Sequence, residues 1–289
     1  MKPRTCLSIG NIGLSAVYDA VDYAKSKDAE FIELRFDMIS ETAPSNNAQD
    51  KSRNNPEGYF HKDAVLPEIK KIISYAKSKG IKTIGTNRYS SYGANGCFSF
   101  LEKQRLGKPS GLEIAEKGAR GALEPERIKF LRATIELGID ICDIELDILE
   151  RKVIKNFIEF AHSKKSRVIL SVHDFNRQIG LLDAVRFYLD SSYFDADYFK
   201  LADTVVSEED AESISEKNIK IRSIKMTDET AFPEFIVFGM GEKGRITRAL
   251  SVIYGSYLAY CSSPYGITAQ GQTTPDEFYK TVGFLEISA

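Results

Sequence analysis

Residues 148–173, ILERKVIKNFIEFAHSKKSRVILSVH, join a segment of helical periodicity to a short apolar run. The helical segment covers 148–165, and the apolar run RVILSVH covers 167–173. A strand that is apolar along nearly its whole length is typical of a parallel sheet covered by helices. The stretch therefore predicts one helix–strand repeat, and it raises the question of why His173 ends a buried strand.

Similar apolar runs recur along the chain and alternate with amphipathic segments. In the segment 66–80, apolar residues fall on one helical face and Gly80 stands where a C-terminal cap is expected. The segment 125–138 has Pro125 in its first turn and Gly138 after its last, which is usual at helix ends. The predicted strands are TCLSIG (5–10), FIELRFDM (31–38), KTIGTNR (82–88), IDICDIEL (139–146), RVILSVH (167–173), YFKLAD (198–203), EFIVFGM (234–240) and YLAYCSS (257–263).

Eight such units predict an α/β fold of the (β/α)8 or TIM barrel type, since open doubly wound sheets usually have fewer strands. We interpret residues 1–289 as one barrel domain, although 250–263 could in part continue the preceding helix. Two insertions follow the second and third strands: 41–63 is rich in Asn, Ser and Pro, and 89–124 contains Gly-rich stretches. We expect both to form long βα loops at the carboxyl ends of the strands, where barrel active sites lie.

The composition excludes several classes of protein. The chain has 43% hydrophobic and 28% charged residues, a net charge of −2 and no long basic run, so nucleic acid is not an expected partner. No apolar run approaches a membrane span, and the N-terminus lacks the apolar core of a secretory signal. The four cysteines are far apart without a CxxC pair, which argues against structural zinc and disulfides. We expect a cytoplasmic protein that acts on a small molecule, and a homodimer stays open.

Lys200 stands out because it lies inside the apolar run 198–203. A surface lysine would extend its amine into water, but an inward-facing lysine of a barrel reaches water only through the mouth. Burial and neighbouring cations such as Arg248 would favour a neutral, nucleophilic amine. Such an amine forms a Schiff base with a ketone or aldehyde, and the protonated imine makes the adjacent carbon acidic. His173, one strand earlier, could then move the protons.

Charged residues also end other predicted strands. Glu33, Arg35 and Asp37 alternate along the second strand, so we expect all three to face the barrel lumen. Asp143 and Glu145 alternate in the same way on the fourth. Clustered charges are costly inside a barrel unless they pair and bind something polar, and a purely structural salt-bridge cluster is the alternative.

Five motifs resemble those of the type I 3-dehydroquinate dehydratases. They are ELRFD (33–37), SVHDF (171–175), FKLA (199–202), MGxxGxxTR (240–248) and TAQGQ (268–272), the last similar to the family's SAPGQ loop. They occur in the family's order and, with the first-strand serine, span residues 8–272. The resemblance implies a (β/α)8 barrel of the shikimate pathway. It also implies dehydration of 3-dehydroquinate to 3-dehydroshikimate through a lysine Schiff base, with no metal and no other cofactor.

The resemblance assigns roles residue by residue. Lys200 corresponds to the imine-forming lysine, and His173 corresponds to the general acid and base. Arg248 corresponds to the arginine that binds the substrate carboxylate, a task suited to two parallel N–H donors. The other substrate contacts that the family implies are Ser8, Glu33, Arg35, Arg88, Thr268 and Gln272.

The chain departs from the family's pattern in three ways. Members often carry a glutamate four residues beyond the third-strand arginine, where it helps to orient the histidine. That position is Tyr92 here, so Glu145 or Asp143 could take over the task. Thr268 replaces a serine conservatively, whereas Gln270 replaces a proline in the last loop. The chain is also longer than most members, and the additional residues fall in the two insertions.

Three other functions stay open from the residues alone. Strand-end carboxylates and His173 could hold Mg²⁺ or Mn²⁺ in a metal-dependent sugar isomerase or epimerase, although arginines 35, 88 and 248 would repel the ion. The segment GMGEKG (239–244) could bind a phosphate in another Schiff-base lyase or aldolase. The non-enzymatic alternative is a binding protein that kept the barrel without turnover, and the missing glutamate is its support.

Overall fold

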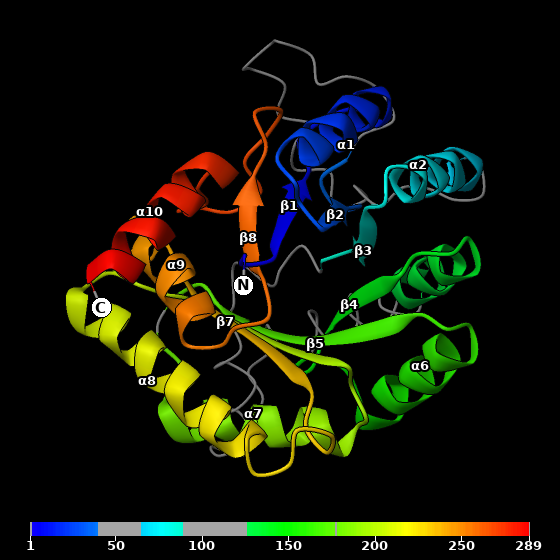
Figure 1. The fold of residues 1–289 in the computed structure, drawn as a ribbon. Helices are drawn as coiled ribbons and strands as arrows, with labels where there is room; N and C mark the ends of the chain where they lie inside the picture. The colour runs from blue at the N-terminus through cyan, green and yellow to red at the C-terminus, as the bar shows by residue number, and fades with distance from the viewer. Residues whose placement is uncertain (1, 40–64, 89–125, 177, 289) are drawn as a thin grey trace, which may run out of the picture.

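Eight parallel strands form the centre of the computed structural model (Figure 1), in the order β7-β6-β5-β4-β3-β2-β1-β8. The model describes residues 2–39, 65–88, 126–176 and 178–288. The predicted insertions 41–63 and 89–124 lie outside these residues. The strands are β1 (Thr5–Ile9), β2 (Phe31–Arg35), β3 (Lys82–Thr86), β4 (Ile141–Glu145), β5 (Arg167–Asp174), β6 (Tyr198–Thr204), β7 (Glu234–Met240) and β8 (Ala259–Ser262).

Helices surround the strands on the outside (Figure 1), as expected when each parallel strand is followed by a crossover helix. A further helix lies between β3 and β4, and the structure describes residues 126–136 of it. The other helices are η1 (Leu14–Ala16), α1 (Val17–Ser26), α2 (Leu66–Ser78), α6 (Arg151–Ser163), α7 (Leu181–Tyr193), α8 (Glu208–Lys225), α9 (Arg245–Ile253) and α10 (Pro275–Ser288).

Local sequence explains where several helices begin and end. In α2, Ile69, Ile72 and Ile73 are buried at helical spacing, and the chain leaves the helix through Gly80 at φ 76°. The first turn of α8 is fixed by a capping box, in which Ser207 and Asp210 bond each other's backbone N–H groups. Residues 250–253 belong to α9, as the sequence allowed, and the helix ends at Ile253 before β8 begins at Ala259.

Alternation along the strands produces two separate apolar layers. Side chains that face the lumen form one buried cluster, with Ile84, Ile141, Ile169 and Ile236 among its members. Side chains that face outward pack against the helices in a larger cluster. Because the lower lumen is filled with apolar groups, polar side chains at the carboxyl ends of the strands meet above it.

The barrel closes between β7 and β8. Among the described residues these two strands are not joined by a ladder, but the Tyr257 N–H donates to the Phe235 carbonyl at 2.7 Å. Above them, the Gly241 N–H donates to the Gln270 carbonyl at 3.3 Å. Gly271 has φ 73°, and a β-carbon there would overlap the Gly241 carbonyl, so this contact requires glycine.

The structure confirms the predicted (β/α)8 barrel and all eight predicted strands, with small differences at their ends. A search of the described residues finds no helix long and apolar enough to cross a membrane.

Candidate active site

Lys200 lies on β6 and points into the barrel mouth, where 4% of it is exposed. Its Nζ is 3.0 Å from Asp143 Oδ2 on β4 and 3.7 Å from Glu33 Oε1 on β2. The amine also lies 4.1 Å from the centre of the Tyr260 ring. The ion pairs of Lys200 are thus with carboxylates, whereas Arg248, the cation expected near the amine, donates to backbone carbonyls. Four strands, β2, β4, β6 and β8, therefore place one amine between two carboxylates and an aromatic face.

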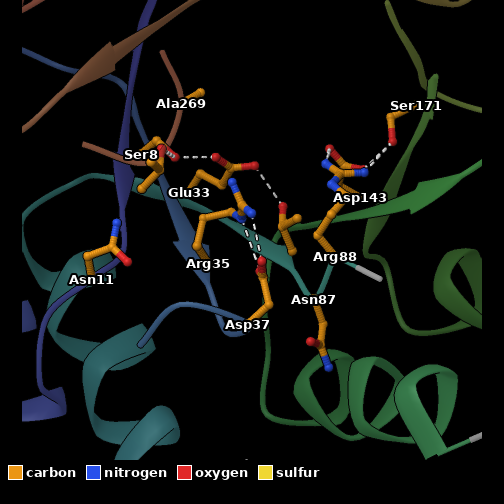
Figure 2. A network of polar contacts seen from close by, with 12 residues as sticks. Ser8, Asn11, Glu33, Arg35, Asp37, Asn87, Arg88, Asp143, Ser171 and Ala269 are labelled. Carbon is orange, nitrogen blue, oxygen red and sulfur yellow. Dashed lines mark hydrogen bonds and ion pairs between the residues drawn. The ribbon is translucent and has the colours of Figure 1, made fainter. Parts of the chain in front are cut away.

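Asp143 is the centre of the polar network (Figure 2). Arg88 reaches it from the end of β3, with Nη2 at 3.1 Å from Oδ2. The hydroxyl of Ser171 on β5 donates to Oδ1 at 2.6 Å. Burial alone would raise the pKa of Asp143, but Arg88 and Lys200 outweigh it and hold the pKa well below its usual range. The carboxylate is therefore a permanent anion at neutral pH.

Glu33 links the lysine to the other side of the mouth. The hydroxyls of Ser8 on β1 and Thr86 on β3 both donate to this carboxylate, Thr86 at 2.8 Å. The alternation rule correctly places Glu33 in the lumen. Arg35 instead makes a two-point contact with Asp37 at 3.0 and 2.6 Å (Figure 2). Because β2 ends at Arg35, Asp37 belongs to the following turn and not to the lumen face of the strand.

The last predicted loop joins this network from β8. The hydroxyl of Thr268 lies 2.7 Å from that of Ser8, and the side-chain oxygen of Gln272 accepts the Thr268 N–H at 3.0 Å. The Ala269 N–H donates to the same oxygen at 3.2 Å. Gln272 thus holds the loop in a tight turn, and Thr268 connects the loop to β1.

His173 is buried at the end of β5, next to the strand of Lys200. Its ring stacks on Phe175 with centroids 6.0 Å apart. Burial, and then the charges of Arg88 and Lys200, lower the pKa of His173 well below its usual value. The imidazole is therefore neutral at pH 7 and can accept a proton.

Arg248 comes from α9 and contacts the last loop. Its Nε donates to the Gly271 carbonyl at 3.0 Å, its Nη1 donates to the Tyr260 carbonyl at 3.2 Å, and the guanidinium lies over Phe238. Burial lowers the pKa of Arg248 to about 10, so it remains a cation. Within the part of the chain that the structure describes, its buried Nη2 has no hydrogen-bond partner. A charged donor is therefore available for an anion.

Direct contacts join six of the nine predicted site residues. Five of them contact one another in series: Ser8, Glu33, Lys200, Thr268 and Gln272. Arg88 joins this series through Asp143. His173 interacts electrostatically with this group. Arg35 and Arg248 lie around it with other partners.

The predicted set omitted residues that complete the network, namely Asp143, Thr86, Ser171 and Arg127. Asp143 gave a signal, because it alternates with Glu145 on an apolar strand. Thr86 and Ser171 lie on the lumen face of their strands, but Thr and Ser are common in strands, so the sequence did not single them out. Arg127 lies on a helix, and its sequence context does not indicate a lumen contact.

The fold and these contacts define a TIM-barrel protein with a buried lysine and a neutral histidine on adjacent strands. The chain belongs to the type I 3-dehydroquinase family, whose model matches residues 5–289. The chain is 32% identical over 165 residues to a 3-dehydroquinate dehydratase of Coxiella burnetii strain Dugway, which covers 56% of this chain and 63% of that protein.

Two further relatives match over more of the chain. The 3-dehydroquinate dehydratase of Methanosarcina acetivorans is 25% identical over 266 residues, covering 91% of this chain and 88% of that protein. Among solved structures, the type I 3-dehydroquinate dehydratase of Clostridium difficile superposes with a TM-score of 0.69 at 21% identity, covering 100% of this chain and 94% of that one. At this identity the superposition supports the fold alone.

Proposed function

We propose that this protein dehydrates 3-dehydroquinate to 3-dehydroshikimate through a Schiff base on Lys200, with His173 as acid and base. The observation that carries the proposal is the placement of Lys200: a buried amine at the barrel mouth, 3.0 Å from Asp143 and one strand from a neutral histidine. A lysine with these surroundings has no packing role that an apolar residue could not fill.

The first step forms the imine. Lys200 gives a proton to His173, and its amine attacks the substrate ketone. The imidazolium returns the proton to the carbinolamine hydroxyl, which leaves as water while the carbon–nitrogen double bond of the iminium forms. The resulting iminium keeps the positive charge between Glu33 and Asp143, which already face the ammonium. These fixed carboxylates stabilise the cation without reorganising.

The second step removes water across two carbons. His173 takes a proton from the carbon next to the iminium, and the electron pair moves into the carbon–nitrogen system. The enamine then expels the hydroxyl group on the next carbon, and the imidazolium returns its proton to that leaving oxygen. Water finally hydrolyses the imine and frees Lys200. The lowered pKa of His173 supports the first half of this cycle, because the ring is neutral when it must act as a base.

Substrate binding is assigned to the polar groups around the amine. Arg248 offers its unpartnered Nη2 and a net positive charge to the substrate carboxylate. Thr268 and Gln272 present a hydroxyl and an amide from the last loop, while Ser8, Glu33, Arg35 and Arg88 surround the ring hydroxyls. We assign the orientation of His173 to Asp143. The negative charge of Asp143 raises the pKa of His173 and so offsets part of the lowering caused by burial and by the cations. Tyr92 lies outside the described residues.

The contacts disfavour the two other enzymes. The carboxylates that could bind a metal are already paired with cations: Asp143 with Arg88 and Lys200, and Glu145 with Arg127. A phosphate site in 239–244 would need open backbone N–H groups, but those of Gly241 and Gly244 donate to carbonyls.

Borohydride trapping tests the proposal. Protein incubated with 3-dehydroquinate and borohydride should gain one substrate- or product-derived mass on Lys200 and lose activity, as read by intact mass and peptide mapping. Lys217 is an internal control, because it is also buried but lies outside the lumen. Complete inactivation with unmodified Lys200 rejects the mechanism. Activity that disappears with EDTA and returns with a divalent metal supports the isomerase alternative.

Four expectations stay predictions: the homodimer, the cytoplasmic location, the lack of nucleic acid partners and the single-domain interpretation of 1–289. Cys6, Cys142 and Cys261 are free and buried, which is compatible with a reducing compartment.

A further inference from the structure

Arg127 is a fully buried arginine outside the predicted site. It lies near the start of the helix 126–136, and its side chain is 0% exposed. Its Nη1 is 2.7 Å from Glu145 Oε2 on β4 and donates to the Asn87 carbonyl at 2.7 Å. Neither partner belongs to its own helix. A guanidinium that gives up its hydration to reach two other elements needs these contacts to offset the cost.

Both contacts lead to Arg88. The second oxygen of Glu145, Oε1, is 3.3 Å from Arg88 Nη1, and Asn87 directly precedes Arg88 in the chain. Arg127 therefore restrains Arg88 through its side-chain partner and through its backbone. Arg88 in turn holds Asp143 (Figure 2), the carboxylate that contacts Lys200.

The connected group contains both acids and bases. Within the described residues, its ion pairs join Glu33, Asp143 and Glu145 with Arg88, Arg127 and Lys200. Loss of Arg127 would remove one of the cations that contact Glu145. Glu145 would then compete with Asp143 for Arg88, since a buried carboxylate without a cation attracts the nearest one strongly.

We propose that Arg127 is a positioning residue of the active site. It neutralises Glu145 and thereby keeps the Arg88 guanidinium on Asp143, without touching the substrate. The catalytic consequence rests on the proposed dehydratase function, whereas the positioning of Arg88 does not.

Activity measurements test the consequence with four variants. Arg127→Met should lower kcat/KM at least about tenfold, the usual effect of losing a hydrogen bond to a charged group. Arg127→Lys, which keeps the charge, should recover part of this loss. Glu145→Gln added to Arg127→Met should also recover activity, because the carboxylate that competes with Asp143 for Arg88 is then neutral. Arg132→Met is the matched control: it lies on the same helix, contacts the Asn156 carbonyl and Phe160, and should match the parent.

Rescue by Glu145→Gln separates positioning from simple packing. A packing defect at residue 127 would not be repaired by a change on β4, so additive losses in the double variant overturn the proposal. Parent-like kcat/KM in folded Arg127→Met overturns it as well. If Arg127→Met does not fold, the same test compares the kcat/KM of Arg127→Lys with that of the double variant.

A crystal structure provides a readout that does not depend on turnover. In Arg127→Met, or in Arg127→Lys if the former does not fold, Arg88 should shift from Asp143 toward Glu145. An unmoved Arg88 overturns the positioning role. If the parent enzyme does not turn over 3-dehydroquinate, the proposed function fails, and the position of Arg88 still decides this inference.

Discussion

Two buried lysine–aspartate pairs lie on opposite sides of the same strand. Lys200 meets Asp143 at 3.0 Å inside the barrel, and Lys217 of α8 meets Asp203 at 2.6 Å between β6 and the helices. Lys200 and Asp203 are three residues apart on β6, so alternation sends their side chains to opposite faces. The same type of ion pair thus occurs once in the lumen and once in the outer core.

The partners differ between the two pairs. Lys217 also donates to the Gln178 side chain at 2.7 Å, and Asp203 accepts the Ile179 N–H at 3.0 Å. These contacts fix the segment that follows His173 on β5 against β6. Both side chains of the outer pair are therefore enclosed and contact other groups of the fold. Lys200, in contrast, faces the mouth, where an incoming ketone can reach it.

The carboxylates also differ in their pKa. Asp143 has two cations beside it, and its pKa stays well below the usual range despite burial. Asp203 has one, and burial outweighs Lys217 and raises the pKa of Asp203 to about 6. The number of cations within contact, more than burial itself, decides which carboxylate has the lower pKa.

The largest expected effect is that of Lys200→Met. The variant should have no detectable dehydratase activity and should form no adduct with substrate and borohydride, because the nucleophile is missing. Circular dichroism should show that it still folds. Residual turnover through a noncovalent route, measured with enzyme purified away from host dehydratase, would contradict the Schiff-base proposal.

His173→Ala should lower kcat by about 10²–10⁴-fold, the usual contribution of a positioned acid and base. The substrate can still form an imine on Lys200, so borohydride should trap an adduct that accumulates slowly. The check is kcat together with the time course of adduct formation. A variant within threefold of the parent kcat would assign the proton transfer to another residue.

Lys217→Met should affect stability and not chemistry. Removing one partner of a buried ion pair costs roughly 3–5 kcal/mol, since Asp203 stays behind without its cation. Replacing both partners, as in Lys217→Met with Asp203→Leu, should restore most of the free energy of unfolding. Denaturant unfolding measures both variants. If Lys217→Met is as stable as the parent but inactive, the distinction between the two lysines fails.

Arg248→Lys should mainly raise KM, by about ten- to a hundredfold, because a two-point contact to a carboxylate is worth roughly 1.5–3 kcal/mol. Lysine keeps the charge but cannot hold Gly271 and Tyr260 while it binds an anion. Steady-state kinetics with melting temperature as a control separates binding from folding. An unchanged KM would direct the search for the carboxylate site to Arg88.

The smallest effect is a pH dependence of stability from Asp203. The pKa of Asp203 is about 6 in the folded state against an ordinary value of 3.8, so between these values the folded state holds a proton that the unfolded chain lacks. The contribution of Asp203 to the free energy of unfolding therefore decreases as pH rises through this window. The melting temperature of the parent should therefore rise relative to that of Asp203→Asn as the pH is lowered from 7 to 4. A constant difference would show that Asp203 stays ionised.

Sequence reasoning found the strands because buried parallel strands carry a dense local signal. The apolar run around Lys200 indicated a buried, inward-facing lysine, and only 4% of Lys200 is exposed. The neighbours of Lys200 could not be derived in this way, since Glu33 and Asp143 come from strands far apart in sequence. The effect expected of Arg248 on Lys200 could not be derived for the same reason: parity specifies a face of one strand and not the distance between two side chains.

By itself, the sequence determined the eight strand–helix units, the parity of the strand residues and the chemical types present at the barrel mouth. These follow from backbone periodicity and local burial, which are encoded within each segment. The tertiary structure alone decided which carboxylates face Lys200, that Arg127 reaches β4 from a helix, and that Asp143 and Asp203 titrate differently. These properties depend on distances between elements and on desolvation, which exist only after the chain has packed.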